Sequence, residues 1–143
     1  MVGLHNNVPS NSDEIPSELG GLRMTKQRKE VYGVLLDKRD HPNAQDVFLR
    51  VKERMPSISL ATVYNCLEAL VGHQLVKQVN FDRSPTRYCP NLQEHVHFQN
   101  EATGEVHDVF FKDGTRLEDL LDLPQGVEVR ELELTMKGQM PTS

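Results

Sequence analysis

The apolar residues of this chain change their spacing just after Gly72. Between residues 25 and 72 they recur every three or four positions, which is the period of an amphipathic helix. Beyond that point two short extended runs, Leu75–Val79 and Thr86–Tyr88, flank a turn-like segment at Phe81–Pro85, as in a β-hairpin. The sequence therefore predicts an α+β chain that begins with helices and continues in strands.

Three helices are expected before the hairpin, because three side chains suited to N-capping precede apolar stripes. The capping residues are Thr25, Asn43 and Ser59. The third helix is expected to end at Gly72, since glycine favours the C-terminus of a helix. Three helices followed by a hairpin describe a winged helix-turn-helix, whose last helix enters the major groove of DNA.

The third helix has two distinct faces. Its apolar positions follow helical spacing, and its other face carries Thr62, Tyr64 and Asn65. These three polar residues are the candidates for contact with DNA bases. A three-helix domain with a hairpin could equally bind another protein, so the charge of the segment has to decide between the two partners.

Charge is distributed unevenly along the chain, whose formal net charge is -5. Residues 22–83 have a net charge of +4, whereas residues 84–143 have a net charge of -6. A basic half joined to an acidic half favours a nucleic-acid-binding module followed by a sensing or assembly module. A solvated basic surface is the simpler alternative.

Length and cysteine content limit the class of protein. At 143 residues the chain is one domain or two small ones. It has no apolar run of membrane-spanning length, and its first residues lack the pattern of a signal peptide. Its two cysteines, Cys66 and Cys89, have no paired spacing, which argues for a reducing compartment. We expect a cytoplasmic protein without a membrane partner.

Potential metal ligands gather between Cys89 and Asp108. His95 and His97 are two residues apart, so in a strand both imidazoles face the same side. Thiolate, imidazole and carboxylate suit zinc, or iron and manganese when carboxylate dominates. Alternatively, this is a polar strand with unrelated histidines. A zinc hydrolase would also need a general base; Glu94 and Glu105 have no pocket-like surroundings, so we expect no catalytic residues and no enzyme.

Four segments together resemble the ferric uptake regulator (Fur) superfamily over residues 20–138. They are Met24–Arg28, His41–Val47, Ser59–Asn65 and the His95-Val96-His97 triplet. The resemblance implies a homodimeric, metal-responsive transcription factor. It also implies an N-terminal tail with a short helix at residues 1–20 and a winged helix-turn-helix at 21–88. A hinge at 89–93 and a small α/β domain for dimerisation and metal sensing at 94–143 would follow.

The resemblance also implies a regulatory site. It adds His41, so that one divalent ion per subunit would be held by His41, Cys89, His95, His97 and Asp108. Such an ion would bridge the two domains and fix the DNA-competent dimer, as in a repressor. Arg23 would contact the minor groove or phosphates of double-stranded operator DNA.

The chain departs from the family pattern in its cysteines. It has no Cys-x-x-Cys pair, so a structural four-cysteine zinc site is excluded. The second domain must then be held by its own core and the dimer interface. We expect an apolar layer from a helix at Asp113–Leu123 and a last strand at Glu131–Thr135, built from Leu117, Leu120, Leu121, Leu132 and Leu134.

The identity of the metal is a separate question. Cys89, where peroxide-sensing relatives use aspartate, favours Zn²⁺ over Fe²⁺ or Mn²⁺. An iron-, manganese- or peroxide-responsive regulator remains the alternative, and Cys89-Pro90 leaves a haem-responsive one open. Val96 separates the two histidines where relatives with an additional site have an acid or histidine. We therefore expect one metal site per subunit.

Overall fold

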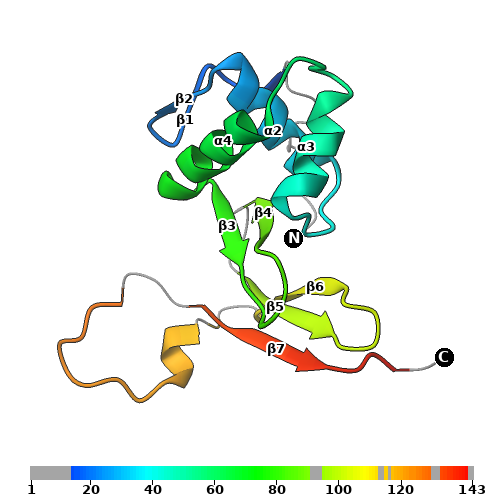
Figure 1. The fold of residues 1–143 in the computed structure, drawn as a ribbon. Coiled ribbons are helices and arrows are strands. Elements are labelled where there is room, and N and C mark those ends of the chain that lie inside the picture. The colour runs from blue at the N-terminus through cyan, green and yellow to red at the C-terminus, as the bar shows by residue number, and fades with distance from the viewer. Residues whose placement is uncertain (1–13, 91–94, 113–114, 116, 130–132, 142–143) are drawn as a thin grey trace. The chain divides into compact units, whose positions relative to one another are not determined.

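A computed structural model describes residues 14–90, 95–112, 115, 117–129 and 133–141. The chain divides into two compact units, residues 1–92 and 93–143, which we call the N-terminal and C-terminal units (Figure 1). The short helix expected in the N-terminal tail falls largely on residues 1–13, outside the described residues. None of the helices in the described part of the chain has the length and hydropathy needed to cross a membrane.

The described residues of the N-terminal unit form three α-helices, each of which begins at the expected capping residue. They are α2 (Lys26–Asp37), α3 (Ala44–Lys52) and α4 (Leu60–Gly72), capped by Thr25, Asn43 and Ser59. The cap of α3 is reciprocal, because the Asn43 side chain accepts from the Asp46 amide and the Asp46 carboxylate accepts from the Asn43 amide. The end of α4 at Gly72 is as expected, and the left-handed residue beyond it is Gln74, with φ 62°.

Two hairpins flank the helices. The hairpin of β1 (Glu18–Leu19) and β2 (Leu22–Arg23) was not predicted. Its turn favours glycine at Gly20, where φ is +57° and a Cβ would lie 2.9 Å from Leu75 Cδ2, so that the leucine side chain would have to shift. The second hairpin pairs β3 (Val76–Val79) with β4 (Arg87–Pro90). β4 extends to Pro90, so Cys89, which was expected in the hinge at residues 89–93, belongs to a strand of the N-terminal unit.

The core of the N-terminal unit lies between the three helices and β3. Its fully buried side chains are Val31, Leu35, Val47, Val51, Val63, Leu67, Leu70 and Val76. Because α2, α3 and α4 all contribute to this one cluster, the packing fixes the direction in which the opposite face of α4 points.

The C-terminal unit contains a three-stranded sheet in the order β6-β5-β7 (Figure 1). β5 (His95–Asn100) pairs antiparallel with β6 (Val106–Phe110) and parallel with β7 (Thr135–Gly138). The expected helix at Asp113–Leu123 was wrong, because the described residues of this segment form only a 3-10 helix, η2 (Leu117–Leu120). The last strand begins at Thr135 rather than ending there; residues 130–132 lie outside the described residues.

The expected apolar layer of leucines is not buried within one chain. Leu120, Leu121 and Leu134 are 67%, 45% and 42% exposed. Leu132 lies outside the described residues, and Leu117 belongs to η2. Val109 and Phe110 on β6 are also exposed. The C-terminal unit therefore leaves apolar surface open to solvent.

Candidate metal centre

Strands β5 and β6 bring three of the expected ligands together within the C-terminal unit. His97 is the register partner of Asp108 across the antiparallel pair, so both side chains lie on the same face of the sheet. His95 precedes His97 by two residues on β5 and shares that face. His107, one residue before Asp108, has a half-exposed side chain 3.8 Å from the Glu105 carboxylate.

The three ligand atoms converge on one point. His95 Nε2 lies 3.1 Å from His97 Nε2, and Asp108 Oδ1 lies 3.2 Å from the first and 3.4 Å from the second. Both histidines are buried, with 7% and 6% of their surface exposed. Two imidazole nitrogens and a carboxylate oxygen therefore share a small, largely dry volume.

These separations match a metal-binding arrangement. With bonds of about 2.1 Å to nitrogen and oxygen, neighbouring ligand atoms stand about 3.0 Å apart in an octahedral shell and about 3.4 Å apart in a tetrahedral one. All three observed distances fall in that range. Two histidines and one carboxylate suit Fe²⁺, Mn²⁺ or Zn²⁺ and leave coordination positions for further ligands.

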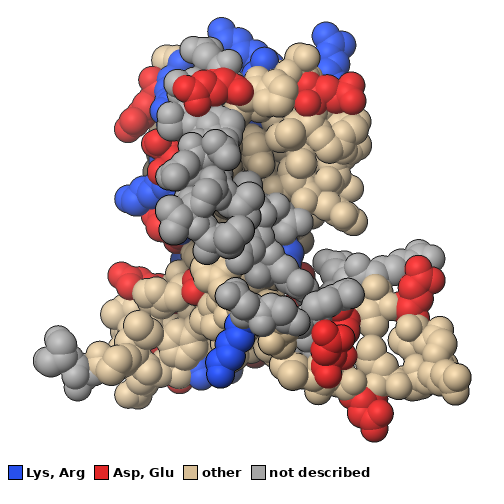
Figure 2. All heavy atoms as spheres, turned by 180° about the vertical axis from the view of Figure 1, so that it is seen from behind, with Lys and Arg blue, Asp and Glu red and all other residues tan. Residues whose placement is uncertain are grey.

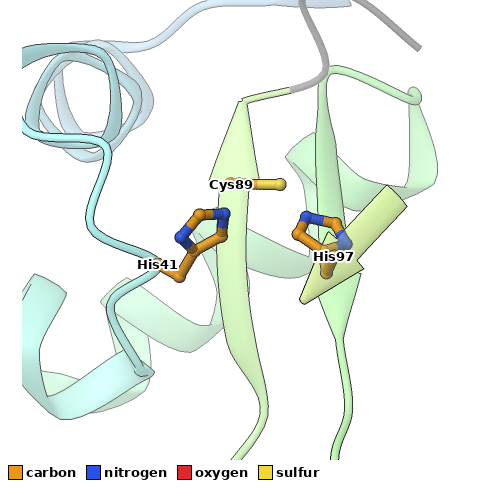
Figure 3. Close-up of side chains that lie close together, drawn as sticks. All are labelled: His41, Cys89 and His97. Atoms are coloured by element: carbon orange, nitrogen blue, oxygen red, sulfur yellow. The ribbon is translucent and has the colours of Figure 1, made fainter. Parts of the chain in front are cut away.

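The N-terminal unit contributes a second, smaller set of ligands. His41 lies in the loop before α3 and Cys89 lies on β4 (Figure 3). A ring nitrogen of His41 and the sulfur of Cys89 lie within 4.8 Å of each other, and both residues are 2% exposed. An imidazole with a thiolate is a softer donor pair than the set on β5 and β6 and prefers zinc. Two ligands alone do not complete a protein metal site.

The other cysteine has the environment of a packing residue. Cys66 faces the core from α4 and is 5% exposed. Burial raises the pKa of its thiol, and the nearby Arg28 charge only partly opposes this shift. The thiol therefore stays protonated near neutral pH, as expected for a residue that is not a ligand.

The expected DNA-contacting residues lie on the surface of the N-terminal unit. Tyr64, which is 46% exposed, and Asn65 point away from the core face of α4. Thr62 is half-buried, and its hydroxyl lies 2.9 Å from the hydroxyl of the capping Ser59. Arg23 is exposed at the end of β2, where its carbonyl accepts a hydrogen bond from Arg28.

Figure 2 shows how charged side chains are distributed on one side of the molecule. On the face drawn in Figure 2, basic and acidic side chains are interspersed over the molecule, and no single continuous basic patch stands out. The positive net charge of residues 22–83 is therefore spread over a mixed surface on this side. The exposed polar face of α4 is a more distinctive feature of the N-terminal unit than its charge.

The comparisons with known proteins agree on one family. The model of the ferric uptake regulator family matches residues 20–137. The ferric uptake regulation protein of Bacillus subtilis is 31% identical over 136 residues, which cover 88% of this chain and 89% of that protein.

Two solved structures have a similar fold. The peroxide stress regulator of Campylobacter jejuni is 31% identical, with a TM-score of 0.71 over 81% of this chain and 87% of that one. The ferric uptake regulator of Pseudomonas aeruginosa with manganese is 25% identical, with a TM-score of 0.67 over 86% and 93% of the two chains. On the match to the family model and the length of the shared sequence, this chain belongs to the ferric uptake regulator family.

Proposed function

We propose that the chain is a metal-dependent transcriptional repressor that binds operator DNA as a homodimer. The observation that carries this proposal is the convergence of His95, His97 and Asp108 at metal-ligand distances. The exposed polar face of α4, with Tyr64 and Asn65, supports DNA as the partner. Members of the family are transcriptional regulators rather than enzymes.

The metal would couple sensing to DNA binding through ligands from both units. His95, His97 and Asp108 leave coordination positions open, and His41 with Cys89 offers the two further donors. Binding through both sets would restrict the freedom of the two units relative to each other. In a dimer the two copies of α4 must be about 34 Å apart to enter successive major grooves. The metal would act as a corepressor, because it would select the arrangement of the dimer in which the two copies of α4 have this spacing.

A second copy of the chain would cover the apolar surface of the C-terminal unit. Val109, Phe110, Leu120, Leu121 and Leu134 are between 38% and 67% exposed. Apolar groups that a small unit cannot bury by itself favour association with another copy. No four-cysteine zinc site can help, because the chain has only Cys66 and Cys89. Dimerisation would therefore rest on apolar packing.

Zinc is the metal we favour, with one ion per subunit. The thiolate of Cys89 and the imidazole of His41 would add soft donors to the set on β5 and β6. A specific observation supports a second candidate. The two imidazoles and one carboxylate of the C-terminal unit also suit Fe²⁺ or Mn²⁺, and a relative with 31% identity is a peroxide stress regulator. An iron- or manganese-dependent repressor is therefore the alternative.

The test measures DNA binding as a function of each metal. Duplexes would be selected from a random pool with purified protein in Zn²⁺, Fe²⁺ or Mn²⁺, and the enriched sequence used in gel-shift titrations. We expect sequence-specific binding that requires one of these metals and is lost in excess chelator. His97→Ala should remove the metal response, whereas the matched control His107→Ala should retain it, because His107 lies outside the ligand set. Equal specific binding with and without metal would refute the proposal.

A further inference from the structure

The backbone at His41 is in a conformation that is uncommon for residues other than glycine. Its φ is 57°, in the left-handed region that residues other than glycine rarely adopt. Such a conformation persists only where neighbouring groups hold it. The loop that presents the His41 imidazole must therefore be held by specific contacts, and those contacts decide where the ring nitrogen lies.

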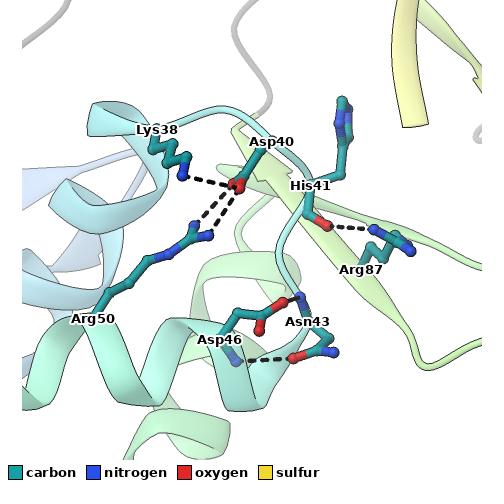
Figure 4. A network of polar contacts seen from close by, with 7 residues as sticks. All are labelled: Lys38, Asp40, His41, Asn43, Asp46, Arg50 and Arg87. Carbon is teal, nitrogen blue, oxygen red and sulfur yellow. Dashed lines mark hydrogen bonds and ion pairs between the residues drawn. The ribbon is translucent and has the colours of Figure 1, made fainter. Parts of the chain in front are cut away.

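Strand β4 holds this loop at three consecutive loop residues. The Arg87 guanidinium donates a hydrogen bond to the His41 carbonyl at 3.3 Å (Figure 4). The Tyr88 amide donates to the Pro42 carbonyl at 2.9 Å. Asn43 forms an isolated antiparallel bridge with Arg87. The loop is thus attached to β4 at His41 by the Arg87 side chain, and at Pro42 and Asn43 by one stretch of backbone pairing whose hydrogen bond comes from the Tyr88 amide.

The same strand carries the other soft ligand. Cys89 follows Arg87 by two residues on β4, so the two side chains leave the strand on the same side. Arg87 therefore connects the backbone of His41 to the strand segment that presents the Cys89 sulfur. This connection therefore bears on the distance between the His41 ring nitrogen and the Cys89 sulfur, which lie within 4.8 Å of each other.

Helix α3 anchors the loop from its other side. Asp40, directly before His41, accepts two parallel hydrogen bonds from the Arg50 guanidinium, both at 2.8 Å (Figure 4). The Arg50 hydrogen bond lowers the pKa of Asp40, against a smaller opposing effect of burial, so the pair is ionised at neutral pH. The reciprocal cap of Asn43 and Asp46 fixes the loop two residues after His41. In addition to these anchors, Arg87 contacts His41 itself through the hydrogen bond to its carbonyl.

We propose that Arg87 is a positioning residue for the metal site: it sets His41 against Cys89 and thereby raises metal affinity without being a ligand. This inference rests on the proposed function, because it requires His41 to bind the metal. Groups that orient metal ligands from outside the coordination shell typically change affinity by about 10- to 100-fold when removed. Arg87→Gln, which loses the guanidinium, is expected to fall in this range.

The experiment is a double-mutant cycle between Arg87→Gln and His41→Ala in the full-length chain. Zinc affinity is measured by competition with a chromophoric chelator, and thermal unfolding is recorded in excess chelator. Arg54→Gln is the matched control, because Arg54 also pairs with a carboxylate, Glu30 at 3.8 Å, but lies in the turn after α3 rather than on β4. Arg87→Lys is the conservative variant, since its ammonium can still donate to a carbonyl.

We expect Arg87→Gln to weaken zinc binding about 10- to 100-fold in the natural background and less than about 2-fold in His41→Ala. Arg87→Lys should recover part of the affinity, Arg54→Gln should have no effect, and the unfolding midpoint without metal should match between Arg87→Gln and Arg54→Gln. Should Arg87→Gln fail to fold, the same cycle with Arg87→Lys must show a loss that disappears in His41→Ala.

Two results would overturn the inference, and only the second would also overturn part of the proposed function. If Arg87→Gln weakens zinc binding equally in both backgrounds, or not at all, Arg87 does not act through His41, and the proposed function stands. If His41→Ala itself leaves zinc affinity unchanged, His41 is not a ligand, and both the inference and the two-unit site of the proposed function are wrong.

Discussion

Replacing Tyr64 with alanine should separate DNA recognition from folding. Fully burying an aromatic side chain stabilises a protein by about 1.5–3 kcal/mol. Tyr64 is 46% exposed, so roughly half of that contribution, at most about 1.5 kcal/mol, is lost on truncation. Small domains have total stabilities of about 5–15 kcal/mol, so the variant should remain folded at room temperature.

The loss in DNA affinity should be larger. A side chain that contacts a base edge typically contributes about 1–3 kcal/mol of sequence-dependent affinity. In the proposed homodimer the substitution is made twice, so the loss amounts to about 2–6 kcal/mol, or roughly 30-fold to 10⁴-fold in dissociation constant. Binding to unrelated DNA depends on phosphate contacts and should change little.

Fluorescence anisotropy with a selected duplex and a scrambled duplex, at one fixed salt and metal concentration, measures both quantities. Leu49→Ala is the control, because Leu49 is 62% exposed but lies on α3 rather than α4. Circular dichroism during thermal unfolding checks the fold of each variant. The assignment of α4 as the recognition helix is refuted if Tyr64→Ala binds the selected duplex within about 2-fold of the natural protein, a change below about 0.4 kcal/mol.

Three further predictions concern the metal, the dimer and pH. Cys89→Ser should weaken zinc binding at least about 10-fold but manganese far less, since thiolate prefers zinc; equal losses in competition titrations would contradict the zinc assignment. Sedimentation velocity in excess chelator should still show a dimer, and a monomer there would mean that metal, not apolar packing, holds the interface. Arg50 lowers the pKa of Asp40, so this pair stabilises the protein above about pH 4 and the gain disappears as pH falls through the lowered pKa. Asp40→Asn should thus cost up to about 1 kcal/mol in urea unfolding at pH 7, and this cost should shrink steadily as the pH is lowered below about 4; a cost that does not change with pH would show that the charge is not responsible.

The helices of the N-terminal unit were predictable because their signals are local. Thr25, Asn43 and Ser59 accept hydrogen bonds from amides three residues ahead, a distance that the sequence displays directly. The β1–β2 hairpin was missed, because each of its strands is only two residues long and so shows no alternation. Its turn depends on the close approach of Leu75 to Gly20, a contact between distant parts of the chain.

The C-terminal unit was harder to predict. The leucines between residues 117 and 123 have the spacing of an amphipathic helix, yet the structure has one 3-10 turn there, and Leu120 and Leu121 are exposed. Helical spacing is stabilised mainly by burial of the apolar face against a partner. A segment with this spacing does not form the predicted helix when the sheet of its own chain leaves the apolar face unburied.

The sequence by itself determined the chemical types of the candidate metal ligands. It also determined that His95 and His97 face the same side, because alternate residues of a strand share a face. The cluster of potential ligands in the sequence included Asp108, and the family resemblance added His41, but only the tertiary structure decided their geometry. Asp108 meets His97 through the register of β5 with β6, and a slip of one residue would turn its carboxylate to the other face. Likewise, the hydrogen bond from Arg87 to His41 spans 46 residues of sequence. Such contacts depend on how separated segments pack, which the spacing of residues along the chain does not specify.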